Sequence, residues 1–248
     1  MASDAPSVQF EPSQPVFLQR AELLMSNLKK MGIGEIEALM KVSRSIAEDV
    51  QERCSKWSVP FTEENAMPAA YGFKGAVYTG LDTRSWTTED MEFAQDHLRI
   101  LSGLYGLLGP KDYMQPYRLE MGLKWPNTSE NKNLYSFWGS ELQLQIDQQA
   151  QGLVVDLASQ EYSKAAQLKS INQRVITPVF KDLVKGEYKA LMAYAKQARG
   201  AMAKFIIQNQ IINPEEMKGF EGMGYQWDAL LSEGDTWLFT RDKNSITS

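Results

Sequence analysis

Gly152-Leu153-Val154-Val155-Asp156-Leu157 and Val175-Ile176-Thr177-Pro178-Val179-Phe180 are the two stretches of sequence that decide the predicted fold. Each is a short apolar run, rich in β-branched residues and with sharp ends, which is typical of a buried strand. Residues 159–166 between them predict one helix, and residues 236–241 alternate as a closing strand. Helical patterns occupy most of the remaining chain. We therefore predict an α+β fold, a single compact domain in which a mixed sheet is surrounded by helices.

The N-terminal part is expected to begin with an extended or flexible lead-in, because residues 1–15 contain three prolines and few large apolar side chains. Apolar residues then recur at three- and four-residue steps over residues 17–28, and a second helix is expected from Gly34 toward Trp57. The Met31-Gly32-Ile33-Gly34 link predicts a tight αα hairpin similar to a helix-hairpin-helix element. No repeat or linker divides residues 16–248, so we predict one domain there.

Start and stop signals place further elements after the hairpin. Helices are expected to start at Thr62 and Thr87, where acidic residues follow a hydroxyl, and the second is expected to end near Gly103 or Gly106. The apolar run at residues 75–81 is bounded by glycines, so it predicts a strand or a buried loop.

Composition excludes several kinds of site and location. The single cysteine, Cys54, cannot close an intramolecular disulfide or supply a thiolate cage, and the single histidine, His97, cannot build a histidine-rich zinc site. No apolar run approaches the roughly 18 residues of a membrane span. No secretory signal is visible either. We therefore predict a cytoplasmic protein without a membrane partner, metal or cofactor, in which His97 and Cys54 have structural roles.

The charge pattern bears on the partner. A net charge of −5 argues against attraction of nucleic acid over the whole surface. Residues 164–204 nevertheless contain nine basic and two acidic side chains, which predicts a local cationic face. In the helix expected at residues 195–209, Lys196 and Arg199 lie three positions apart and share one side, where they could hold a carboxylate or a phosphate. The alternative is that both side chains simply face water.

The densest group of polar side chains lies among glycines and prolines at residues 98–122. Such a segment has a fixed backbone that other groups can approach closely, which is typical of a pocket wall. We predict an anion-binding cleft between this segment and the cationic helix, with the ligands Arg99, Ser102, Gln115, Arg118, Lys196 and Arg199. The candidate catalytic residues are Tyr105, Tyr117 and Glu120, with the carboxylate as general base and a tyrosine as acid or oxyanion donor. The alternative is an internal Arg118–Glu120 ion pair, with the tyrosines as packing.

Several blocks of the chain resemble the signature of the YaaA peroxide stress resistance family. The blocks are Phe73-Lys74-Gly75-Ala76-Val77-Tyr78-Thr79-Gly80-Leu81, Leu101-Ser102-Gly103-Leu104-Tyr105-Gly106, Met114-Gln115-Pro116-Tyr117-Arg118-Leu119-Glu120-Met121-Gly122, Leu134-Tyr135-Ser136-Phe137-Trp138-Gly139, Leu157-Ala158-Ser159-Gln160-Glu161-Tyr162 and Ala198-Arg199-Gly200. Several long matches in the same order are specific, unlike a lone short motif. The resemblance implies a compact α+β fold of unusual topology and resistance to hydrogen peroxide through lowered free iron and less oxidative DNA damage.

The resemblance also implies a helix-hairpin-helix element that binds DNA, which maps onto residues 28–39. The residues expected to contact DNA are Lys29, Lys30, Gly32, Gly34, Lys41, Arg44 and, on the cationic helix, Lys204. Glycines in the hairpin allow backbone N–H groups to face a phosphate. Glu35 and Glu37, in contrast, satisfy the helix dipole themselves, which favours a plain αα hairpin.

The chain departs from the family pattern at several positions. The opening strand with Ser-Pro-Ala-Lys-Thr has no counterpart, and Ala76, Asp156 and Gln197 stand where the family carries aspartate, asparagine and lysine. These differences are typical of a specialised member. The family association favours a DNA-binding stress protein that limits iron-driven oxidative damage. The alternatives are an enzyme acting on a small anionic substrate in a biosynthetic pathway and a protein that sequesters iron or a metabolite through oxygen ligands. The residues specify neither whether the protein is an enzyme nor its oligomeric state.

Overall fold

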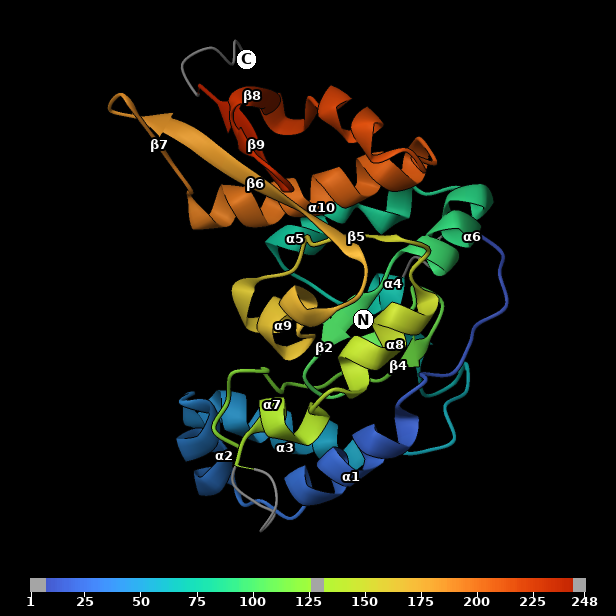
Figure 1. Ribbon diagram of the computed structural model, residues 1–248. Coiled ribbons are helices and arrows are strands. Elements are labelled where there is room, and N and C mark those ends of the chain that lie inside the picture. Colours follow the sequence, from blue (N-terminus) through green and yellow to red (C-terminus); the bar gives the residue numbers. More distant parts are fainter. Residues whose placement is uncertain (1–7, 126–131, 243–248) are drawn as a thin grey trace.

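A mixed sheet forms one end of the molecule (Figure 1). The computed structural model describes residues 8–125 and 132–242. The strands of this sheet are β5 (Leu153–Val155), β6 (Arg174–Val184), β9 (Thr236–Arg241), β8 (Gln226–Glu233) and β7 (Glu187–Lys189). The three strands expected from sequence, β5, β6 and β9, are neighbours and run parallel, whereas β8 and β7 pair antiparallel with β9 and β6. The predicted α+β fold is confirmed.

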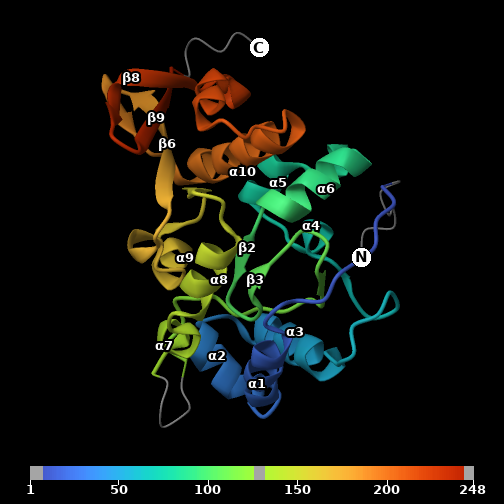
Figure 2. The same ribbon diagram turned by 45° about the vertical axis from the view of Figure 1, so that its right-hand side comes forward.

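The long helix α10 (Met192–Gln208) covers one face of this sheet (Figure 2). Residues alternate along β6, so that Phe180 is buried on the helix side and stacks with Phe239 of β9 at 5.4 Å between ring centroids. The short helices η3 (Pro214–Gly219) and η4 (Gly222–Gly224) complete this core. The cationic helix expected at residues 195–209 is thus present.

The opposite side of α10 crosses α5 (Ala76–Leu81) at a contact that only glycine permits. A Cβ atom on Gly80 would lie 2.0 Å from the backbone oxygen of Gln197, and one on Gly200 would lie 1.8 Å from that of Val77. The prediction of a strand or a buried loop for this segment was therefore wrong. Its apolar residues and glycines form a helix–helix contact, and tertiary packing overrides the weak helix preference of the sequence.

Three helices, α1 (Leu18–Leu28), α2 (Ile33–Met40) and α3 (Arg44–Lys56), form the end of the molecule opposite the sheet (Figures 1 and 2). The single helix predicted from Gly34 toward Trp57 was wrong, because Lys41 adopts a left-handed φ of 52° that ends α2. Both α1 and α2 pack against α3. The closest helix pair at this end is therefore α2–α3, and the predicted hairpin link connects α1 to it.

Short elements fill the space between the two ends. They are, in chain order, β1 (Met67–Pro68), α4 (Ala69–Gly72), η1 (Thr83–Ser85), α6 (Thr88–His97), β2 (Ile100–Ser102), β3 (Gly106–Leu108), β4 (Tyr113–Met114), α7 (Leu134–Trp138), α8 (Glu141–Gln149), α9 (Gln160–Ala165) and η2 (Leu168–Ser170). The helix α9 is the one expected between the strands β5 and β6. The small hairpin of β2 and β3 lies within residues 98–122, which we call the glycine-rich segment.

Local hydrogen bonds explain one confirmed helix start and one wrong one. The Thr87 hydroxyl accepts the N–H of Asp90, and the Asp90 carboxylate accepts the N–H of Thr87, so the predicted cap of α6 is confirmed. This helix ends before Gly103 because β2 follows it. No helix starts at Thr62, whose N–H donates to Asn65 Oδ1 within a turn. Pro68 also disfavours a helical backbone conformation in the residue before it.

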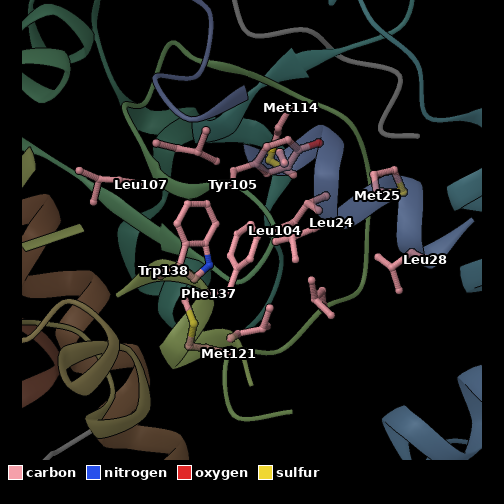
Figure 3. Packing of buried hydrophobic residues seen from close by; sticks show 14 of the residues in the cluster. Leu24, Met25, Leu28, Leu104, Tyr105, Leu107, Met114, Met121, Phe137 and Trp138 are labelled. Atoms are coloured by element: carbon pink, nitrogen blue, oxygen red, sulfur yellow. The ribbon is translucent and has the colours of Figure 1, made fainter. Parts of the chain in front are cut away.

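A second hydrophobic core joins the helical end to these short elements (Figure 3). Leu104 and Tyr105 are fully buried and gather with Trp138 of α7 and Leu24 of α1. Gly106 has a φ of 70°, and a Cβ there would come within 2.7 Å of the Trp138 ring. The signature block at residues 101–106 therefore has a packing role at its apolar positions.

The edge strand β8 carries an irregularity. Its pairing with β9 shifts register between Asp228 and Glu233. Asp228 Oδ1 accepts the N–H groups of Leu230 and Leu231, and the Ser232 hydroxyl donates to Asp228 O. Leu230 is left 96% exposed at the tip. The bulge thus satisfies its own amides.

No helix in residues 8–125 and 132–242 combines the length and the apolar character that crossing a bilayer requires.

Candidate functional site

The glycine-rich segment forms a tight turn around Ser102. A Cβ on Gly103 would lie 2.1 Å from the backbone oxygen of Leu119, so only glycine lets the two halves of the segment approach. The hydroxyls of Ser102 and Tyr117 are 2.6 Å apart, and Ser102 Oγ accepts the N–H of Tyr105. Burial raises the pKa of Tyr117 well above its usual value. Its hydroxyl is therefore protonated, and a hydrogen-bond donor, at neutral pH.

Tyr105 and Gln115 belong to an internal network. Trp57 Nε1 donates to the Tyr105 hydroxyl at 3.0 Å, and that hydroxyl donates to the Gln115 carbonyl. The Gln115 side chain accepts the N–H of Ser58 and donates to its carbonyl. Burial raises the pKa of Tyr105 to about 12. The polar groups of Tyr105 and Gln115 are thus hydrogen-bonded within the protein, where they hold the loop after α3 in place.

The remaining predicted residues of this segment also bond within the molecule. Arg118 Nη2 is 2.9 Å from Glu120 Oε1, which is the ion pair given as the alternative interpretation. Arg99 Nε donates to Gln149 Oε1, and its Nη1 donates to backbone carbonyls at the end of α6. Burial lowers the pKa of Arg99. Neither arginine has its guanidinium free of protein partners.

Arg199 on α10 differs from these arginines. Its only hydrogen bond within the described residues runs from Nη1 to Ala158 O at 3.4 Å, and no carboxylate there comes within ion-pair distance. Burial lowers its pKa, opposed by Asp156, whose oxygens accept the Ser163 hydroxyl and the Ala158 N–H. Lys196, one turn earlier, is exposed and has no bonding partner among the described residues. We refer to Asp156, Ala158, Ser163, Lys196 and Arg199 as the Arg199 cluster.

Aromatic side chains connect α5, the helix in contact with α10, to the glycine-rich segment. On α5, which touches α10 beside Arg199, Tyr78 stacks on Phe73 at 5.0 Å between ring centroids. Phe73 in turn packs edge-on against Tyr117 at 6.4 Å. Burial raises the pKa of Tyr78, and it raises that of Tyr162 to about 12 with a contribution from Glu161. Sequence reasoning missed Tyr78, Tyr162 and the Asp156–Ser163 contact, although the first two lie in the signature blocks.

Two hollows of the described surface lie elsewhere. One of about 730 Å³ is lined by β8 and β9 residues such as Trp227, and one of about 340 Å³ lies against Phe10 and Tyr113. Neither is lined by Arg118 or Arg199. The cleft between those residues thus stays a prediction.

Some charged side chains of the predicted DNA-contacting hairpin have partners within the protein. Lys29 Nζ donates to the Trp57 carbonyl at 2.7 Å, and Arg44 pairs with Glu48 at 3.1 Å. The Gly32 N–H, at the start of α2, donates to Glu35 Oε2, which occupies one of the amides expected to face a phosphate. Lys30, Gly34 and Lys41 are exposed, and these two lysines have no ion-pair partner in the described chain.

Lys204 was expected to contact DNA together with the hairpin. It lies on α10, and Figures 1 and 2 place α10 and the α1–α2 link toward opposite ends of the molecule. Its Nζ is 2.7 Å from Asp82 Oδ2. The structure therefore does not bring this lysine beside Lys30 and Lys41.

His97 and Cys54 have local partners. Within α6, His97 Nδ1 lies 2.8 Å from the Phe93 carbonyl, and the two rings stack at 4.0 Å. Cys54 is buried, and burial raises its pKa to about 11. Within the ranges that the structure covers, no three or more His, Cys, Asp or Glu side chains are grouped to hold a metal ion.

Comparison with known proteins assigns the family. The family model described as "Peroxide stress protein YaaA" matches residues 1–231. A UPF0246 protein of Colwellia psychrerythraea is 46% identical over 236 residues, which cover 94% of this chain and 91% of that protein. Relatives from Saccharophagus degradans and Ralstonia pickettii are each 43% identical, over 96% and 92% of this chain and 94% and 90% of their own lengths. The chain therefore belongs to the family of the peroxide stress protein YaaA.

Proposed function

We propose that this protein serves the peroxide stress response by binding a small oxyanion, a phosphate or a carboxylate, at Arg199. The observation that carries the proposal is the state of this guanidinium: it is half-buried and has one long hydrogen bond to protein among the described residues. Burying a cation without a counter-charge costs free energy unless a partner compensates for it. An oxyanion would be that partner.

The chemistry around Arg199 suits an oxyanion. A guanidinium presents parallel N–H donors that match two oxygens of a carboxylate or phosphate. Lys196 lies on the same side of α10, one turn away, and could add a second positive charge. The raised pKa values of Tyr78, Tyr117 and Tyr162 keep their hydroxyls protonated, so they would donate hydrogen bonds rather than act as bases. Such a site would serve an enzyme of small anionic substrates as well as a binding protein.

Calorimetric titration with inorganic phosphate and with citrate tests the proposal. The Arg199→Met variant keeps an apolar stem and removes the charge, and we expect it to lose about tenfold or more in affinity, since a charge-assisted contact contributes about 1.5 kcal/mol or more. Arg84→Met is the matched control, because Arg84 is exposed and has no ion-pair partner in the described chain. Equal losses in both variants, or no binding by the unmodified protein, would contradict the proposal.

DNA binding by the α1–α2 link is a second candidate, through which the protein would limit iron-driven oxidative damage to DNA. The exposed and unpaired Lys30 and Lys41 at the two ends of α2 favour it. In a fluorescence anisotropy titration with duplex DNA, the Lys30→Glu/Lys41→Glu variant should bind more weakly and lower the salt dependence by about two counterions. Lys169→Glu, at another exposed position, is the control. Salt-independent binding, or binding unchanged in the double variant, would remove this candidate.

A further inference from the structure

Met192 stands apart from the other methionines that the structure describes. Its side chain is 66% exposed at the first turn of α10. The described methionines that are buried are Met25, Met40, Met91, Met114, Met121, Met202 and Met217. Met31, Met67 and Met223 are partly covered. A reagent in solution therefore meets the Met192 sulfur before the others.

The thioether of an exposed methionine reacts with hydrogen peroxide, the stress named in the family's description. One peroxide oxygen forms a bond to sulfur as the O–O bond breaks, and the other oxygen leaves as water with both hydrogens. Sulfur is oxidised by two electrons and peroxide is reduced. The product, methionine sulfoxide, carries a polar S=O group that accepts hydrogen bonds.

Helical spacing places Met192 beside the Arg199 cluster. Met192, Lys196 and Arg199 are at positions i, i+4 and i+7 of α10, so they follow one another along one side of the helix. Lys196 is exposed and has no bonding partner in the described chain, which leaves its ammonium free to turn toward a new acceptor one turn away. A sulfoxide at Met192 would be such an acceptor.

We propose that Met192 is the first described methionine to be oxidised by peroxide, and that its sulfoxide draws Lys196 away from an anion held at Arg199. The second half rests on the proposed function. Oxidation thereby weakens anion binding. Methionine sulfoxide reductase restores it with a dithiol as reductant: the dithiol is oxidised to a disulfide, and the sulfoxide oxygen leaves as water. The site of oxidation is independent of whether Arg199 binds an anion.

The first test is a time course of hydrogen peroxide treatment, followed by peptide mass spectrometry. Met192 should gain one oxygen first, and the seven buried methionines should react on the order of tenfold more slowly or less, because their sulfurs become accessible only through local opening. A buried methionine that is oxidised as fast as Met192, or a Met192 that resists oxidation, would overturn the proposed site.

The second test is phosphate titration before and after oxidation. Oxidised protein should bind about two- to fivefold more weakly, the size of one exposed ionic contact, and methionine sulfoxide reductase should reverse the loss. Met192→Leu should keep its affinity through the same treatment. Unchanged affinity in an oxidised protein that still depends on Arg199 would overturn the switch alone, whereas equal affinity in the unmodified protein and Arg199→Met would overturn the proposed function.

Discussion

Two arginines, the buried Arg241 and the half-buried Arg199, differ in the partners of their guanidinium groups. In the C-terminal sheet, Arg241 Nε donates to Asp182 Oδ1 at 2.7 Å, its Nη1 donates to the Met223 carbonyl, and its guanidinium lies over the Tyr225 ring at 4.3 Å. The Tyr225 hydroxyl donates to the second oxygen of Asp182. On α10, Arg199 has one hydrogen bond of 3.4 Å among the described residues.

The difference separates a charge that supports the fold from one for which we propose a ligand. Asp182 and Arg241 have almost no exposed side-chain surface, and each is the counter-charge of the other, so the pair ties β6 to β9. Asp156, whose charge opposes the effect of burial on the Arg199 pKa, accepts its hydrogen bonds from the Ser163 hydroxyl and the Ala158 N–H. Burial alone therefore does not distinguish the two arginines, whereas the hydrogen bonds and ion pairs of each guanidinium within the described residues do.

The largest expected effect comes from breaking the compensated pair. Asp182→Ala leaves the Arg241 guanidinium buried without its counter-charge, and we expect the free energy of unfolding to fall by about 3 to 5 kcal/mol. Urea denaturation measures this change. The control is Asp235→Ala at the exposed pair with Arg174, where less than about 1 kcal/mol is expected. Similar losses in both variants would erase the contrast between buried and exposed pairs.

Removing the Arg199 charge is expected to change the free energy of unfolding in the opposite direction. Without ligand, Arg199→Met is expected to raise the free energy of unfolding by about 1 kcal/mol, because the side chain keeps its packing and the desolvated charge disappears. Thermal and urea denaturation in a buffer free of phosphate and carboxylates check this result. A loss of stability instead would show that the guanidinium already has the partners it needs.

The smallest expected effect is the change in phosphate affinity on substitution of Asp156. Asp156→Asn retains an oxygen for the Ala158 N–H and removes a negative charge that opposes an incoming anion. Phosphate affinity should rise by about 0.5 to 1 kcal/mol, while the free energy of unfolding stays nearly constant. Calorimetric titration at low salt is the measurement, and a fall in affinity would mean that Asp156 takes part in binding.

The strands β5, β6 and β9 could be predicted because their signals lie within the strands themselves. In β6, for example, the signal is a short apolar run with β-branched residues, Val175-Ile176-Thr177-Pro178-Val179-Phe180, and it lies within the strand that the structure shows. The helix α5 could not be predicted, since its conformation depends on Gly80 and Gly200 meeting across more than a hundred residues of chain. The break after α2 depends on the left-handed backbone of Lys41, a residue with no particular preference for it.

The candidate site was predictable only in part for the same reason. The three-residue spacing of Lys196 and Arg199 gives their shared side of α10 directly. Which cations lack partners could not be read from the sequence: Arg99 and Lys204 find theirs at Gln149 and Asp82, far away along the chain. The burial of Tyr78 on α5 and of Tyr162 on α9 depends on how these helices pack, which the sequence does not specify.

The bulge in β8 reduces the number of free amide groups at the edge of the sheet. A long, flat edge strand offers free amides to the edge of another molecule, which is a common route to fibrous aggregates. Here Asp228 occupies the amides of Leu230 and Leu231, and the register shift bends the strand. A strand of another copy that pairs with this edge would first have to break the two hydrogen bonds to Asp228, beside a Leu230 side chain that is 96% exposed.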